Sequence, residues 1–297
     1  STVAAIAVGI VYGRGKRVWC RYLCPVTGVF ALLSRLAPVH FKVDRAAWDL
    51  QPAHIPAVDC PPLLNVHALA SASQCHSCGR CSGHRDAVAL TLRWPGSEIV
   101  GSQPGDVGHY EALLLLYGML GFALGAFQWT MASGFVQGRQ WLATWLVDHD
   151  IFWPLASNAP WWVLTHYPQV SEVFSWLDGA GIVAWLTGTA VLVGGFAHLV
   201  IALGARVVRT DWKVLALGLV PMAAANLFLG LSMLTLTQLR TEGIVFHWLP
   251  QARLTLLAVA WLGCVSLCVG QQRRAGMPVW RSAMATASPS SSSSRGA

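Results

Sequence analysis

Charged residues are scarce in this chain. Asp, Glu, Lys and Arg make up 11% of its 297 residues, whereas 55% are hydrophobic. Soluble globular proteins carry about 25% charged residues, so this chain has too little polar surface for a shell that faces water on all sides. The composition excludes an ordinary soluble domain and indicates a protein that folds in a lipid bilayer.

Four long windows contain no charged residue at all. A helix needs about 20 residues to cross the hydrocarbon core of a bilayer, and the last window is at the lower limit of the usual range. The windows are 112–133, 181–204, 214–237 and 254–270. We expect an all-α polytopic membrane protein in which residues 112–272 form a four-helix transmembrane unit.

The first 13 residues are apolar but too few to span a bilayer, and the chain does not begin with Met. They also lack the basic start and the small-residue cleavage site of a secretory signal. We interpret residues 1–13 as the end of a truncated transmembrane helix. At the other end, residues 273–297 include a serine-rich stretch that has nothing to pack, so we expect a disordered tail.

Basic residues fall almost entirely on one side of these spans. The segments 14–111, 205–213 and 271–297 hold 17 of the 20 Lys and Arg. The positive-inside rule makes that side cytoplasmic, together with the C-terminus. The formal net charge of +7 follows from this asymmetry. Because the basic run after residue 13 adjoins a span, anionic lipid explains it, and nucleic-acid binding is not expected.

Six of the eight cysteines lie in the segment 14–111. Where two residues separate successive cysteines, their thiolates can converge on one centre. Three cysteines spaced in this way, together with a distant cysteine that precedes Pro, commonly hold a [4Fe–4S] cluster. Disulfides are disfavoured because the segment is expected on the reducing side of the membrane. The spacing is Cys20-x3-Cys24-Pro25, then Cys60-Pro61, then Cys75-x2-Cys78-x2-Cys81.

Structural zinc is the main alternative for these cysteines. Cys-x2-Cys also suits zinc, and His84 follows Cys81 by three residues. Zinc sites typically use two separated pairs, so three cysteines in consecutive x2 steps favour iron–sulfur chemistry. A zinc-stabilised membrane scaffold, which would bind no iron, stays open as an alternative.

The cysteine motifs resemble a known family. Residues 17–26 (RVWCRYLCPV) resemble the CRYLCP element of the membrane polyferredoxins of the NapH, NosR and CcoG type. Residues 75–85 (CHSCGRCSGHR) are similar to the YccM-like branch. The resemblance covers residues 14 to about 95 and implies a small, irregular ferredoxin-like segment with two [4Fe–4S] clusters. It also implies a protein of the bacterial inner membrane.

The cysteine pattern departs from a bacterial ferredoxin in two ways. Arg85 stands where such a run would place a fourth cysteine followed by Pro, so the fourth ligand has to be Cys60 or, alternatively, Cys24. Two clusters also need eight thiolates, whereas the segment offers six. We assign Cys60, Cys75, Cys78 and Cys81 to one cluster, and Cys20 and Cys24 to a second whose other ligands are missing here.

Two cysteines of the last window, Cys264 and Cys268, lie four residues apart on one helix face. They could supply the missing pair of ligands. Cysteines in buried helices commonly serve as small apolar side chains, so we favour packing for both.

Three polar features of the membrane unit are weaker candidates for functional sites. The outer loop at 134–180 contains six Trp, which favour short helices at the outer interface over a quinone site. His198 lies inside a span and predicts a helix–helix hydrogen bond, with Asn226 as the expected partner, rather than haem ligation. The group Asp148, His149 and Asp150 favours a solvated loop over a metal site or proton relay.

The resemblance implies an electron-transfer protein that relays electrons between a quinone pool or cytoplasmic donor and a partner redox protein. An assembly factor that reduces a metal for delivery is the alternative that the same family implies. No Ser–His–Asp order, phosphate loop or dinucleotide fingerprint occurs. A stand-alone enzyme is therefore not expected.

Overall fold

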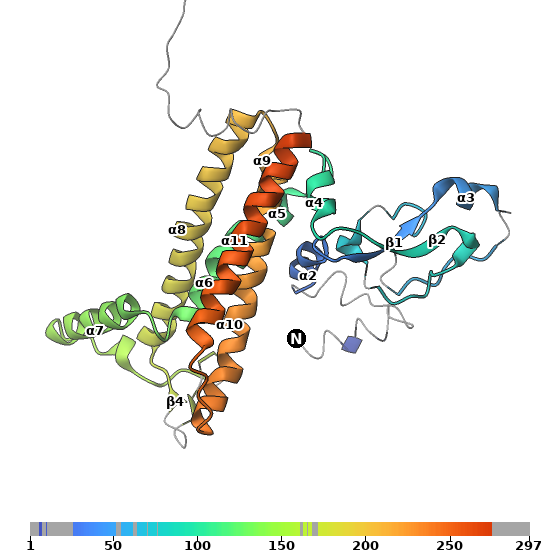
Figure 1. Cartoon of the computed structure of the whole chain (residues 1–297). Helices are drawn as coiled ribbons and strands as arrows, with labels where there is room; N and C mark the ends of the chain where they lie inside the picture. Colours follow the sequence, from blue (N-terminus) through green and yellow to red (C-terminus); the bar gives the residue numbers. More distant parts are fainter. Residues whose placement is uncertain are drawn as a thin grey trace, which may run out of the picture. The chain divides into compact units, whose positions relative to one another are not determined.

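We describe the chain from a computed structural model (Figure 1). It divides into two compact units, residues 1–115, 201–221 and 259–297 forming one, and residues 116–200 and 222–258 the other. Cys20, Cys24, most of the predicted helix end at 1–13 and the predicted tail after Arg274 lie outside the described residues. The structure describes residues 6–7, 10, 26–51, 55–61, 64–69, 71–75, 77–160, 163–164, 166–167 and 172–274.

Among the described residues, four helices are long and apolar enough to cross a membrane, and each contains most of one predicted window. Their terminal turns carry charged residues such as Asp178, Arg206 and Arg240, because charged side chains are costly at the centre of a bilayer. The predicted multi-pass helical fold is thereby confirmed. The helices are His109–Gln128, Trp176–Val208, Trp212–Thr241 and Leu249–Arg274.

The first and third of these spans are each built from several helical segments, whereas α8 (Trp176–Val208) and α11 (Leu249–Arg274) are continuous (Figure 1). The first span ends before residue 133 because another helix, α7 (Ser133–Asp148), begins there. The segments of the first span are α5 (His109–Leu113), the π-helical η5 (Leu114–Phe122) and α6 (Ala123–Gln128). Those of the third are α9 (Trp212–Ala216), η8 (Leu217–Leu219) and α10 (Val220–Thr241).

Glycine allows α8 to approach the first span closely. A Cβ atom added to Gly121 would lie 2.8 Å from the Cα and carbonyl oxygen of Ala190. Likewise, a Cβ on Gly194 would lie 2.9 Å from the Leu116 carbonyl oxygen. Close backbone contact of this kind is how small residues hold membrane helices together, where lipid offers no hydrophobic driving force between helices.

Polar side chains inside the spans bind neighbouring helices. The hydroxyl of Tyr117 lies 3.1 Å from His198 Nδ1, so His198 does make a helix–helix hydrogen bond, but the expected partner Asn226 was wrong. Asn226 instead donates from Nδ2 to the Met119 carbonyl at 2.8 Å. Met119 lies in the π-helical η5, and side-chain insertion into the backbone ladder commonly accompanies such distortion.

The end of α11 packs against two other segments of its own unit. Gln271 donates from Nε2 to the Val214 carbonyl of α9 at 2.7 Å. Cys264 is 6% exposed, and the Cys268 sulfur lies where a Cβ on Gly218 would otherwise fit. Both cysteines therefore fill helix–helix contacts, as the packing interpretation predicted.

The cysteine-bearing segment is less irregular than expected, because strands β1 (Val39–Val43) and β2 (Val88–Leu92) form an antiparallel sheet. Val39 pairs with Leu92 and Val43 with Val88, which puts Phe41, Val43 and Val88 on one face. That face covers a small core of Phe41, Val66 and Val88. The segment also contains five short helices: α2 (Val26–Ser34), α3 (Arg45–Leu50), η3 (Ala72–Gln74), η4 (His84–Asp86) and α4 (Ser97–Gly101). Figure 1 labels α2, α3 and α4.

The outer loop holds α7 and three short pieces: η6 (Trp153–Leu155), β3 (His166–Tyr167) and β4 (Glu172–Val173). Arg139 of α7 forms an ion pair with Asp178 at the start of α8. Asp148, His149 and Asp150 are all exposed at the end of α7, and His149 stacks on Trp145 with ring centroids 4.1 Å apart. These contacts agree with a solvated polar loop.

The close approach at Gly121 predicts a measurable effect of one methyl group. We expect Gly121→Ala to destabilise the protein by about 1–3 kcal/mol, because the Ala190 backbone cannot move away as a flexible side chain would. Gly188→Ala on α8 is the matched control, since its Cβ would meet nothing within 4 Å. Thermal unfolding in detergent, followed by circular dichroism, measures the difference. Equal melting temperatures for the two variants would contradict the proposed helix contact.

Candidate iron–sulfur site

Cys75 is fixed by the short helix before it. Ser71 caps η3 by accepting a hydrogen bond from the Ser73 N–H at 3.0 Å, and the Cys75 N–H closes the turn on the Ala72 carbonyl at 3.1 Å. The chain then turns sharply, because Ser77 and Gly79 adopt positive φ angles of 49° and 80°. Glycine favours this left-handed conformation, so the residues after Cys75 cannot continue as a helix.

Cys78 and Cys81 lie in the turns that follow. The His84 N–H donates to the Cys81 carbonyl at 3.1 Å, and the Gly83 N–H donates to the Val88 carbonyl of β2 at 2.8 Å. Cys78 is exposed, whereas Cys75 and Cys81 are half-buried. The turn therefore holds Cys81 against the sheet and leaves Cys78 at the surface.

Cys60 joins the same region from a separate part of the chain. An ion pair of 3.0 Å connects Asp59 to Arg80, so the immediate neighbours of Cys60 and Cys81 meet. Cys60, Cys75 and Cys81 all pack against the core of Phe41, Val66 and Val88. The structure thus brings three of the four predicted ligands onto one core, with Cys78 between two of them in sequence.

Burial raises the pKa of the Cys81 thiol above its ordinary value, and the neighbouring Cys75, Cys78 and Cys60 raise it further. Each of these three thiols would carry negative charge if ionised, so each opposes the ionisation of Cys81.

The donor set fits a [4Fe–4S] cluster. Three thiols pack against one core and Cys78 lies in the turn between two of them. The Ser77 N–H donates to the Cys75 sulfur at 3.3 Å, the kind of hydrogen bond that tunes cluster sulfurs. Among the described residues, no three His, Cys, Asp or Glu side chains converge tightly enough to bind one metal ion. In a four-iron cluster each cysteine binds a different iron. The four cysteine sulfurs therefore lie farther apart than the ligands of a single metal ion.

Aromatic packing and ion pairing occupy the polar residues around the site. The ring of His84 packs on Trp48 with centroids 5.1 Å apart, and the Arg85 guanidinium lies 5.1 Å from the centre of the Trp48 ring. Arg80 is neutralised by Asp59. Two of the arginines that lie near cysteines in the sequence, Arg80 and Arg85, therefore contact other groups. A third, Arg21, lies next to Cys20 in the sequence and outside the described residues.

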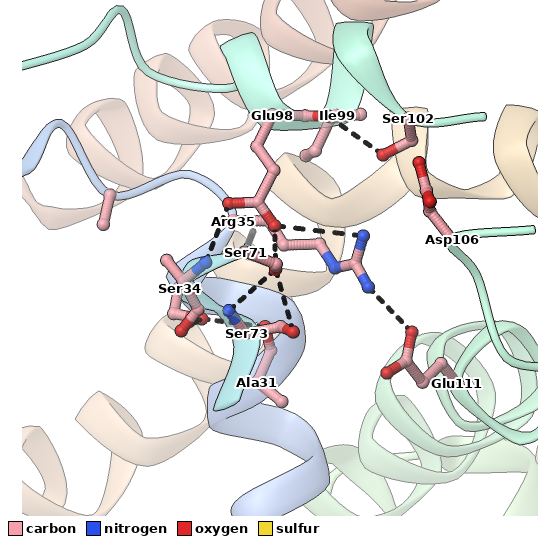
Figure 2. Close-up of polar contacts among 12 residues, drawn as sticks. Ala31, Ser34, Arg35, Ser71, Ser73, Glu98, Ile99, Ser102, Asp106 and Glu111 are labelled. Carbon is pink, nitrogen blue, oxygen red and sulfur yellow. Dashed lines mark hydrogen bonds and ion pairs between the residues drawn. The ribbon is translucent and has the colours of Figure 1, made fainter. Parts of the chain in front are cut away.

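A buried polar network beside the cysteines was not predicted from the sequence (Figure 2). Glu98 forms an ion pair of 2.6 Å with Arg93 and accepts a hydrogen bond from the Ser71 hydroxyl. Arg35, whose side chain is 3% exposed, pairs with Glu111 at 2.9 Å. Glu98, Arg35, Arg93 and Ser71 line a cavity of about 710 Å³. Because Arg35, Ser71 and the Arg93–Glu98 pair come from three separate parts of the sequence, no local motif could have indicated the network.

Comparison with known protein families finds a match in one region of the chain. Residues 2–44 match a family model described as a 4Fe-4S binding domain. No curated protein and no solved structure matches the chain. The matched residues include Cys20 and Cys24 and end just after β1, so Cys60 and the Cys75–Cys81 turn follow the match. A 4Fe-4S binding domain in a multi-pass membrane protein implies an iron–sulfur redox or electron-transfer role.

The burial of Cys81 predicts an order of reactivity in iron-free protein. At pH 8 we expect iodoacetamide to modify exposed Cys78 several-fold faster than Cys81, because the raised pKa leaves Cys81 with less thiolate. The difference should shrink as the pH rises through that raised pKa. Tryptic cleavage at Arg80 separates the two cysteines for mass spectrometry. Equal rates at pH 8 would contradict the buried placement of Cys81.

Proposed function

We propose that this protein is a membrane-anchored electron-transfer protein, in which Cys60, Cys75, Cys78 and Cys81 hold one [4Fe–4S] cluster. The observation that carries the proposal is the packing of Cys60, Cys75 and Cys81 against the core of Phe41, Val66 and Val88, with Cys78 in the turn between two of them. When bound, such a cluster supplies one-electron redox chemistry. Cys20 and Cys24, in the matched region, are proposed to contribute to a second cluster.

The residues of the chain support this role in three ways. Cys60, Cys75 and Cys81 are half-buried, which limits access of water and oxygen to their sulfurs. The Ser77 N–H donates to a ligand sulfur and stabilises its negative charge. Cys78 is the exposed member of the set and marks the side from which a partner redox protein can approach. The cysteine segment and the C-terminus are proposed to face the cytoplasm of a bacterial inner membrane, following the basic residues.

A cavity in the unit of residues 116–200 and 222–258 supports the proposal that the protein exchanges electrons with a lipophilic donor or acceptor. It has a volume of about 560 Å³ and is lined mostly by Leu, Phe, Met and Val, with Asn226 and Arg253 among its few polar groups. Arg253 contacts the Met233 sulfur at 2.6 Å, and no described carboxylate forms an ion pair with it. A quinone suits such a site because its ring is apolar, while its two carbonyl oxygens accept hydrogen bonds from groups such as Arg253.

The first test of the proposed cluster is the iron content of cysteine variants. We expect Cys75→Ser and Cys81→Ser to lose about four iron atoms per chain and the corresponding EPR signal of dithionite-reduced, anaerobically purified protein. Cys268→Ser is the matched control, because Cys268 packs in α11, and its iron content should equal that of the wild type. Zinc in place of iron in the wild-type protein would refute the redox proposal.

The quinone proposal predicts a selective effect of Arg253. In proteoliposomes, we expect Arg253→Gln to raise the quinone concentration needed for half-maximal oxidation of the reduced cluster by about ten- to a hundredfold. Such a change corresponds to the loss of a charged hydrogen bond. Reduction by dithionite should be unchanged, and Arg240→Gln, outside the cavity, is the control. If both variants respond to quinone as the wild type does, the cavity is not the quinone site.

A further inference from the structure

The backbone of Ala72 connects three separate parts of the cysteine-bearing unit. Its N–H donates to Glu98 Oε2 at 3.1 Å. Its carbonyl accepts the hydroxyl of Ser34, the last residue of α2, at 3.1 Å. The same carbonyl also accepts the N–H of Cys75 at 3.1 Å. Cys75 is therefore connected to both α2 and Glu98 through the backbone of a single residue.

Glu98 itself has little freedom to move. Arg93 donates to the same Oε2 atom at 2.6 Å, and the Ser71 hydroxyl donates to Oε1. The side chains of Glu98 and Arg93 are both 11% exposed. Figure 2 shows the Glu98 carboxylate next to Ser71 and Arg35. With both oxygens engaged by groups from different segments, any shift of the Glu98 carboxylate would break several bonds at once.

Arg93 continues the connection to α2. Its Nη2 donates to the Ser34 carbonyl at 3.1 Å and its Nε to the Ala37 carbonyl at 2.8 Å. These carbonyls end the helix, where a cation is electrostatically favoured. Because α2 begins two residues after Cys24, the same ion pair connects the chain segment that follows Cys24 to the turn that carries Cys75.

We infer that Glu98 is a positioning residue of the cluster site, which holds Cys75 through the backbone of Ala72 and sets its placement relative to α2. The inference rests on the proposed ligation by Cys75. Its consequence is that Glu98 controls the geometry of one ligand sulfur and the placement of that ligand relative to α2. Cluster properties depend on ligand geometry and on nearby charge, so both should respond to changes at Glu98.

The test compares three variants of the full-length protein, purified anaerobically. Glu98→Ala removes the acceptor for the Ala72 N–H, and we expect an altered EPR line shape, a shifted midpoint potential and partial loss of iron. Glu98→Gln keeps an oxygen for that N–H but removes the charge, so the line shape should return to that of the wild type while the potential is raised. Glu111→Gln is the matched control, because Glu111 binds Arg35 but not the Cys75 turn.

A milder pair of variants covers the case in which Glu98→Ala does not fold. Ser34→Ala removes the hydroxyl that binds the Ala72 carbonyl, whereas Ser102→Ala removes one that binds only the Glu98 backbone carbonyl. We expect an altered EPR signal for the first and a wild-type signal for the second.

Two results separate this inference from the proposed function. Wild-type line shape and potential in Glu98→Gln, Ser34→Ala and any folded Glu98→Ala would overturn the positioning role, even if Cys75→Ser loses its iron. Full iron content in Cys75→Ser would instead overturn the proposed ligand set.

Discussion

The cysteine-bearing segment has a small apolar core, and three of its cysteines lie directly against it. Phe41, Val66 and Val88 form the buried centre, with Cys60, Cys75 and Cys81 packed around them. A core of this size supplies little hydrophobic stabilisation, and small segments usually need a metal or another cross-link to fold. Binding of a cluster would join Cys60 to the Cys75–Cys81 turn covalently through its irons. The free energy of cluster binding is then also free energy of folding for this segment.

Polar groups provide the second source of order. Glu98, Arg93 and Arg35 are nearly buried, and charges at such depth are tolerated only when they are paired and hydrogen-bonded. Their pairing ties α2, η3 and α4 together through polar contacts, in addition to buried apolar residues such as Leu32 and Ile99. This arrangement suits a site that has to hold cysteine sulfurs at fixed positions, because a charge network has one satisfied geometry whereas a loose apolar core tolerates several.

The sequence was sufficient to predict the spans and the iron–sulfur class, because both depend on local patterns. Uncharged windows and a Cys-x2-Cys-x2-Cys run need no knowledge of distant contacts. Alternating residues such as Val39, Phe41 and Val43 could also have indicated β1. By contrast, the Arg93–Glu98 network and the meeting of Ser34 with Ala72 join residues whose pairing only the fold determines. The partner of His198 was missed for the same reason, since several spans offered a polar residue at a suitable depth.

Within the spans, most polar side chains that we describe serve the helices themselves. Asn226 holds the Met119 carbonyl, Tyr117 holds His198, and Ser and Thr hydroxyls bond to carbonyls one turn earlier. Such contacts remove the cost of a polar group in hydrocarbon. Arg253 differs, because the side-chain contact that the structure describes for it is the Met233 thioether, a weak acceptor for a full positive charge. It also lines the apolar cavity of its unit. These two observations are why we propose that a ligand supplies its acceptor, and they set Arg253 apart from the residues that only hold helices together.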